Sequence, residues 1–213
     1  MIRRRTALSV SAVALLSASP LLAACGSAPH PGSAAVVDGE RITLSQLQAQ
    51  VEDVRVAQRG SAQPAQLIQN SGQLTRATLG SMIFNRVLNR AAEDAGVTVS
   101  RGDVQKARAE MVKQAGSEDR LNAQWLQQYA IAPGQVDEAI HNQVAMDKLA
   151  QALGADRNSP QGVQKLVTAL GAASRELGVE VNPRFGAWDS KKVQLGDAKT
   201  PWLRAAPKEK SQA

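Results

Sequence analysis

The residue types that most often carry out catalysis are scarce in this chain. It has two histidines, His30 and His141, and a single cysteine, Cys25. His30 lies in a stretch rich in Pro and Gly, and His141 lies in a helical pattern. Neither has a serine elbow, a carboxylate pair or a second histidine at a recognised spacing. Gly-rich phosphate loops and Walker sequences are also missing from the sequence. We therefore expect a protein that is not an enzyme and that uses no metal and no cofactor.

The cysteine, in contrast, has the surroundings of a lipid attachment site. Basic residues 3–5 precede a short apolar run over residues 7–16, as in a secretory signal. The run leads to Leu22-Ala23-Ala24-Cys25, which matches a bacterial lipobox. We predict a signal peptide over residues 1–24 and a diacylglyceryl group on Cys25, rather than an ordinary signal with an incidental cysteine. Two acyl chains would anchor the protein stably at the extracytoplasmic face of the cell membrane. They would also leave no thiol for a disulfide or a metal.

Charge excludes one class of partner. The formal net charge is +6, but three of the 25 basic residues lie in the predicted signal, so the mature chain carries 22 against 19 acidic residues, or +3. Aromatic residues make up 3% of the chain, and no basic cluster is interleaved with them. Nucleic acid is therefore not an expected partner.

Helical periodicity dominates the part of the chain that must form the fold. The apolar spacing predicts helices over residues 44–58, 74–95, 101–112, 118–129, 133–153 and 160–177. Residues 74–95 are apolar on more than one face, which predicts a central helix with several neighbours. Residues 61–73 are polar and are expected to form a loop. Residues 190–213 are polar and Lys-rich, so we expect a disordered tail in which Trp202 has no evident role.

Two short β-prone stretches flank these helices. In the first, apolar runs surround Asp38-Gly39, a pair that accepts the positive φ angles of a type I′ hairpin turn. Thr43 follows as a predicted helix N-cap, with Gln46 as its capping-box partner. The second stretch covers residues 179–188 and begins with a brief β-prone run that ends in Asn-Pro. Because an isolated hairpin is marginal in water, we expect residues 179–181 to pair with the hairpin and Trp188 to cover the junction. The fold class is thus mostly α, a helical bundle with a small β element that pairs an N-terminal hairpin with a returning C-terminal strand. The domain spans residues 34–189 behind a tether over residues 25–33.

The same two stretches carry a family resemblance. AAVVDGERITLSQL, residues 34–47, resembles the start of the SurA N-terminal domain family, which also covers the PrsA-type foldases. VEVNPRFGAWD, residues 179–189, is similar to the segment with which those chaperones return to the same module. The resemblance implies a helical chaperone module whose partners are unfolded or exported polypeptides. Many relatives insert a parvulin-type prolyl isomerase domain before the returning strand. Here the corresponding gap, residues 154–160, is far shorter than the roughly 90 residues of such a domain, so isomerase activity is not expected.

The residues that would contact a client chain are predicted from their chemistry. Apolar and soft side chains adapt to varied peptides, so the candidates are Phe84, Met111, Trp125, Tyr129 and Met146. The alternative for each is a place in the core. Two functions remain open: a membrane-anchored, non-catalytic chaperone, and a structural or scaffold lipoprotein with one fixed partner in the envelope. An open apolar groove would favour the chaperone, and a filled core with one flat patch would favour the scaffold.

Overall fold

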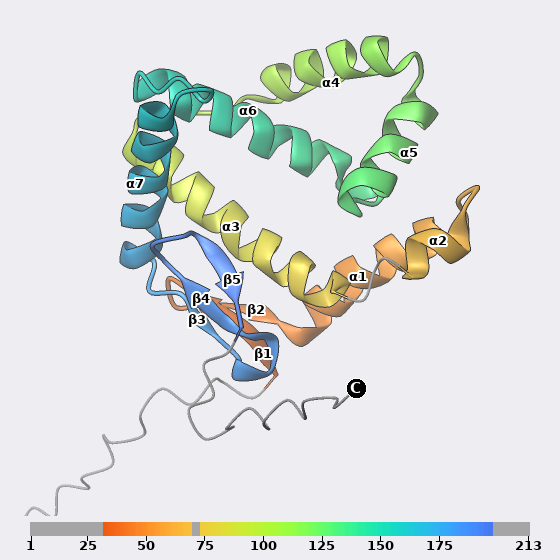
Figure 1. The fold of residues 1–213 in the computed structure, drawn as a ribbon, viewed down its shortest axis with the longest axis horizontal. Coiled ribbons are helices and arrows are strands. Elements are labelled where there is room, and N and C mark those ends of the chain that lie inside the picture. Colours follow the sequence, from red (N-terminus) through yellow and green to blue (C-terminus); the bar gives the residue numbers. More distant parts are fainter. Residues whose placement is uncertain (1–31, 70–72, 198–213) are drawn as a thin grey trace, which may run out of the picture.

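The computed structural model describes residues 32–69 and 73–197, and helices account for most of these residues (Figure 1). The helices are α1 (Leu44–Arg59), α2 (Pro64–Gln69), α3 (Leu74–Asp94), α4 (Arg101–Ala115), α5 (Glu118–Tyr129), α6 (Val136–Ala152) and α7 (Pro160–Glu176), with 3₁₀ turns at Pro133–Gln135 and Pro183–Phe185. The strands are β1 (Ser33–Val37), β2 (Glu40–Thr43), β3 (Glu180–Val181), β4 (Ala187–Asp189) and β5 (Gln194–Gly196). The predicted fold class is confirmed. None of the described helices is both long enough and apolar enough to cross a membrane.

The two ends of the domain meet in one antiparallel sheet with the strand order β2-β1-β3. Asp38 and Gly39 both have positive φ, 55° and 72°, as the predicted tight turn requires. The returning strand lies against β1, where Val181 faces Ala35. Strand β1 begins at Ser33, whose side chain is buried, so the strand takes one residue from the predicted tether.

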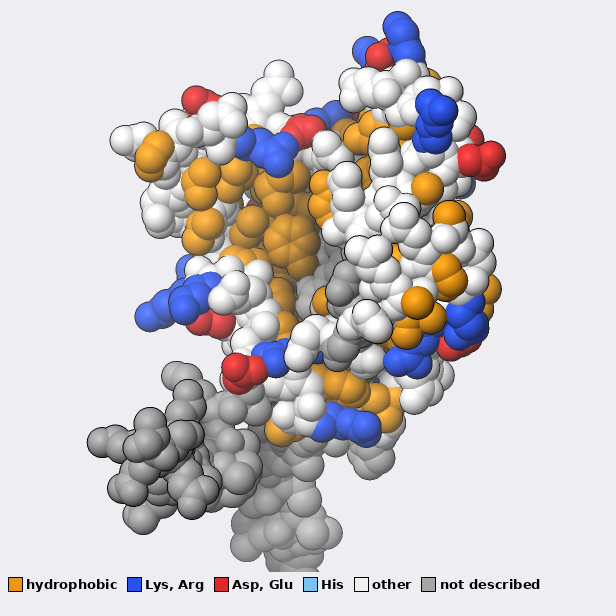
Figure 2. Space-filling model, turned by 45° about the vertical axis from the view of Figure 1, so that its right-hand side comes forward, with side chains coloured by type: hydrophobic (Ala, Val, Ile, Leu, Met, Phe, Trp, Pro, Cys, Tyr) orange, Lys and Arg blue, Asp and Glu red, His pale blue; other side chains and the backbone are white. Residues whose placement is uncertain are grey.

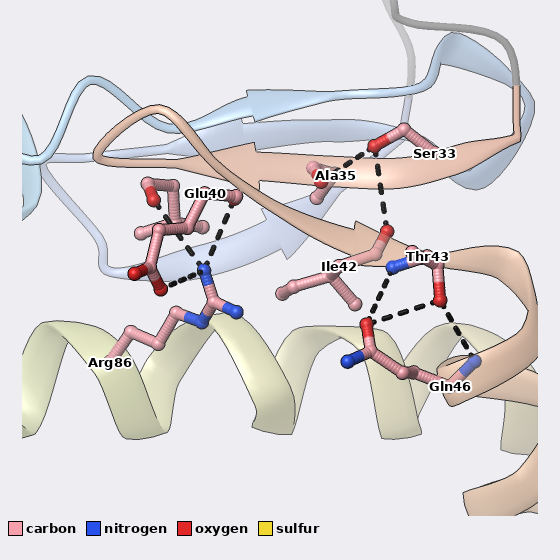
Figure 3. Close-up of polar contacts among 8 residues, drawn as sticks. Ser33, Ala35, Glu40, Ile42, Thr43, Gln46 and Arg86 are labelled. Atoms are coloured by element: carbon pink, nitrogen blue, oxygen red, sulfur yellow. Dashed lines mark hydrogen bonds and ion pairs between the residues drawn. The ribbon is translucent and has the colours of Figure 1, made fainter.

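The hairpin is fastened to two helices, as Figure 3 shows. Thr43 and Gln46 form the predicted capping box at the start of α1, because the Thr43 hydroxyl accepts from the Gln46 N–H and the Gln46 side chain accepts from the Thr43 N–H. From α3, Nη1 of Arg86 donates to the carbonyl oxygens of Glu40 (3.1 Å) and Val37 (3.4 Å). The turn is thereby held over the middle of the central helix.

Helix α3 is the centre of the molecule, as its apolar pattern predicts. It packs against α1, α6, α7 and β1. Its buried residues occur along its whole length and are Leu74, Leu79, Ile83, Val87, Leu88, Ala91 and Ala92. Helix α6 runs beside it in Figure 1, α7 crosses its C-terminal half, and α4 and α5 form an arm beyond α6.

The structure corrects the predicted disordered tail. Strands β4 and β5 form a second hairpin that packs on α3, so regular structure continues past Asp189 to Gly196. The carboxylate of Asp189 accepts hydrogen bonds from the backbone N–H groups of Lys191 and Lys192, and this turn reverses the chain. Val193 is then buried against the core. The Lys-rich composition led to the wrong prediction here, because the lysines belong to a polar turn between two short strands. Residues 198–213, the rest of the predicted tail, lie outside the described residues.

A smaller correction concerns residues 61–73, which were expected to form a loop. Residues Pro64–Gln69 form the short helix α2, with the proline at its first position. Proline suits this place because its fixed φ matches the helix and its missing N–H is not needed in the first turn. Helix α2 packs on α1.

Candidate binding groove

Polar contacts fasten helix α4 of the α4–α5 arm to the rest of the molecule. Every residue of α4 keeps part of its surface exposed. At its start, the Ser100 hydroxyl and the Asp103 carboxylate form a capping box. Nζ of Lys148, on α6, donates to Asp103 Oδ2 at 2.7 Å and to the Thr98 carbonyl at 3.0 Å. The hydrogen bond from Lys148, and next those from Ser100, hold the pKa of Asp103 far below its usual range.

A second set of ion pairs fixes the far end of the arm. Gly116 ends α4 with a φ of 89°, and the Ser117 hydroxyl caps α5. Arg108 of α4 then donates to Glu118 at the start of α5 and to Asp137 at the start of α6. The hydrogen bond that Arg108 donates to Glu118, and then the one that it donates to Asp137, raises the pKa of Arg108. The guanidinium thus joins three helices around the open space between them.

That space is a groove of about 530 Å³ between α3, α4, α5 and α6. Its larger apolar side chains are Phe84, Met111, Leu121, Trp125, Tyr129 and Ile131. The Trp125 and Tyr129 rings meet edge to face, with centroids 5.7 Å apart, and 64% of Tyr129 is exposed. Figure 2 shows hydrophobic side chains gathered along a hollow in the face that it presents. A large aromatic surface therefore remains open to solvent in a protein with few aromatic residues.

The polar part of the groove is uncharged. Six amide side chains line it, namely Asn85, Gln114, Gln124, Gln128, Asn142 and Gln143. All of the described residues in its wall lack a formal charge. An amide both donates and accepts hydrogen bonds, so it matches the N–H and C=O groups of any peptide main chain. The groove can thus receive apolar side chains and a peptide backbone without selecting for charge.

Four of the five predicted contact residues come together in this groove: Phe84, Met111, Trp125 and Tyr129. Met146 does not line it. It lies one turn beyond Asn142 on α6, where it packs against the core. The sequence interpretation missed the amide side chains. A usable signal was present on α5, because Gln124 and Gln128 have the helical spacing i, i+4 beside Trp125.

The remaining residues with chemical potential are not grouped into a reactive site. His141 is half-buried on α6 and does not line the groove. Within residues 32–69 and 73–197, no three His, Cys, Asp or Glu side chains are placed to hold a metal ion. Cys25 and His30 lie outside the described residues, and so does the predicted signal.

Comparison with known proteins gives one family. The model of the SurA-like N-terminal domain matches residues 2–150, more than two thirds of the chain. This range ends inside α6 and contains every residue that lines the groove, whereas α7 and strands β3–β5 follow it. No curated protein and no solved structure matches the chain.

Proposed function

Because the chain belongs to the family of SurA-like N-terminal domains, we propose that it is a membrane-anchored, chaperone-like lipoprotein that binds unfolded or exported polypeptides in the groove. The family consists of chaperone-type modules that bind polypeptides. The observation that carries the proposal for this chain is the wall of the groove, which combines large apolar side chains with uncharged amides. An open groove of this kind favours varied clients over one fixed scaffold partner.

The proposed mode of binding follows from that wall. An extended client would place apolar side chains against Trp125 and Tyr129 and its main chain along the amides of Gln124 and Gln128. A flexible chain loses conformational freedom when it is held, so we expect affinities in the micromolar range. Salt should change these affinities little, since the wall carries no charge to be screened.

The proposed protein acts by holding its clients and not by catalysis. The connection between α6 and α7 comprises residues 153–159, and Lys165 Nζ fastens it through the carbonyl oxygens of Leu153 and Gly154. At this place the resemblance implies an isomerase insertion in many relatives. A seven-residue connection leaves no room for one.

The proposed anchor is a lipid on Cys25, eight residues before β1 begins at Ser33. Such a link spans at most about 28 Å when extended. In Figure 1 the sheet lies at the lower end of the molecule and the α4–α5 arm at the upper end. An anchored molecule would therefore hold its sheet toward the membrane and its arm on the side away from it.

The test is suppression of aggregation of several chemically unfolded proteins, followed by light scattering. The protein should lower the scattering, and Trp125→Asp should remove most of the effect because a charge enters the apolar wall. Val56→Asp is the matched control, since Val56 is 55% exposed on α1 and lies outside the groove. The rate of prolyl isomerisation of a model peptide should be unchanged by the protein. Unaltered scattering with every client, together with one tight stoichiometric envelope partner, would replace this proposal by the scaffold function.

A further inference from the structure

A second hollow shares part of its lining with the groove and lies on the side of the C-terminal hairpin. It has a volume of about 410 Å³ and lies between α3 and the β4–β5 hairpin. Arg76 and Gly80 line it from α3, and Trp188 and Leu195 line it from the hairpin. Ser81 and Phe84 line both this hollow and the groove. The two spaces therefore adjoin along one face of α3.

The described chain ends at the outer end of this second hollow. Asp197 is its last residue, and Asp197 Oδ1 accepts a hydrogen bond of 2.6 Å from Arg76 Nη1. Arg76 and Phe84 are eight residues apart on α3, which is about 12 Å at the rise of an α-helix. The chain that follows Asp197 thus starts at the side chain of Arg76, whose position on α3 is about 12 Å along the helix from Phe84, a residue that lines both hollows.

The following residues have the chemistry to enter this space. Residues 198–204 read Ala-Lys-Thr-Pro-Trp-Leu-Arg, and Trp202 is the one aromatic residue after Asp197. Five residues of extended chain reach about 17 Å, so the Trp202 side chain can lie beside Phe84. Pro201 restricts Thr200 to extended conformations, which reduces the entropy lost on docking. Attachment to the body also gives the segment an effective concentration in the millimolar range.

We propose that residues 200–203 dock in these hollows, with Trp202 against Phe84, and so occupy one end of the client groove. The docking is a property of the chain alone. Its consequence, competition with clients for the shared end of the groove, rests on the proposed function. A client rich in aromatic residues would displace Trp202 from the groove. A client with few aromatic residues would bind more weakly, because Trp202 would stay in place.

Disulfide trapping in the full chain tests the docking. Cys25→Ser removes the one natural cysteine, Ser81→Cys places a thiol in the lining that the two hollows share, and Leu203→Cys places one next to Trp202 in the sequence. We expect a disulfide within one chain, detected by mass spectrometry, at a rate independent of protein concentration. Adding Trp202→Ala keeps the tether identical but removes the anchor, and it should slow the reaction about tenfold, as expected for a tryptophan anchor worth at least a tenfold change in population.

Two results would overturn the docking. Equal rates with and without Trp202 would mean that the tether alone brings the thiols together. A rate that rises with protein concentration would mean that a second copy supplies the segment. The effect on client binding is measured in a separate experiment. There, Trp202→Ala in the natural chain should raise the affinity for clients several-fold. Trapping that depends on Trp202, in a protein that holds no client, would support the docking and contradict the proposed function.

Discussion

The indole N–H of Trp188 donates to the hydroxyl of Ser174 at 2.7 Å, and Ser174 is completely buried in α7. This hydrogen bond ties the C-terminal hairpin to the last helix across 14 residues of sequence. It gives a partner to a hydroxyl that would otherwise be buried without one. The ring also packs against the core, so Trp188 closes the module through both contacts.

Removing the two partners of that bond should show how much it stabilises the fold. Trp188→Phe keeps most of the packing but leaves the Ser174 hydroxyl unpaired, so we expect a loss of about 1–3 kcal/mol in the free energy of unfolding. Trp188→Ala should cost about 3 kcal/mol or more, since packing is lost too. Urea unfolding measures both. Trp188→Phe with Ser174→Ala should lose less than Trp188→Phe alone, and a larger loss would contradict the assigned pairing.

Truncation should locate the true end of the fold. A chain ending at Ser190 lacks β5, the buried Val193 side chain and the partly buried Leu195 side chain. Its free energy of unfolding should be about 2–4 kcal/mol lower, which is the usual gain from burying two aliphatic side chains. A chain ending at Asp197 should keep the thermal stability of the full chain to within a few degrees. Calorimetry distinguishes them, and equal unfolding temperatures for both truncated chains would show that the second hairpin contributes nothing.

The Lys148–Asp103 pair should make the arm sensitive to acid. The pKa of Asp103 is lower in the folded protein than the value of about 4 expected for an unfolded chain. Its stabilising contribution is therefore fully present above pH 4 and is lost as the pH falls below 4 toward the folded value. Lys148→Met should lower the unfolding temperature at pH 7, and the gap to the natural protein should narrow at pH 3. A gap that stays constant would mean that the pair does not couple to folding.

The amides of the groove should act on all clients alike. Replacing both Gln124 and Gln128 by Ala removes hydrogen bonds to the main chain, which every polypeptide shares. We expect affinity to fall about tenfold for each of several unrelated unfolded clients, measured by fluorescence anisotropy. Gln127→Ala is a matched control on the same helix outside the groove. A loss confined to one client would show side-chain selection instead.

Lipidation is tested at Cys25 itself. Cys25→Ala should leave the signal uncleaved at this position and the protein without acyl chains, because no thiol remains to accept them. Metabolic labelling with an alkyne fatty acid, combined with the mass of the product, reads out both steps. Label and mature mass retained in the variant would exclude the lipobox interpretation.

Local patterns of a few residues predicted turns and helix starts from the sequence alone. Asp38-Gly39 sets its own turn because both residues tolerate positive φ. The pairs Thr43–Gln46 and Ser100–Asp103 close their capping boxes within one helical turn, so their identities alone predict where α1 and α4 begin. The central place of α3 follows likewise from apolar residues on more than one of its faces.

Only the tertiary structure decides which side chains share the groove. Met111 and Met146 have the same chemistry and the same helical context, yet Met111 lines the groove and Met146 packs against the core. Helical periodicity predicts that a side chain faces a neighbouring element. It does not predict whether that element buries the side chain or leaves it exposed in a groove. Here the outcome depends on ion pairs between distant residues, Arg108 with Asp137 and Lys148 with Asp103, which fix where the arm stands. The uncharged wall exists only because four helices converge in that arrangement, and no local pattern contains this information.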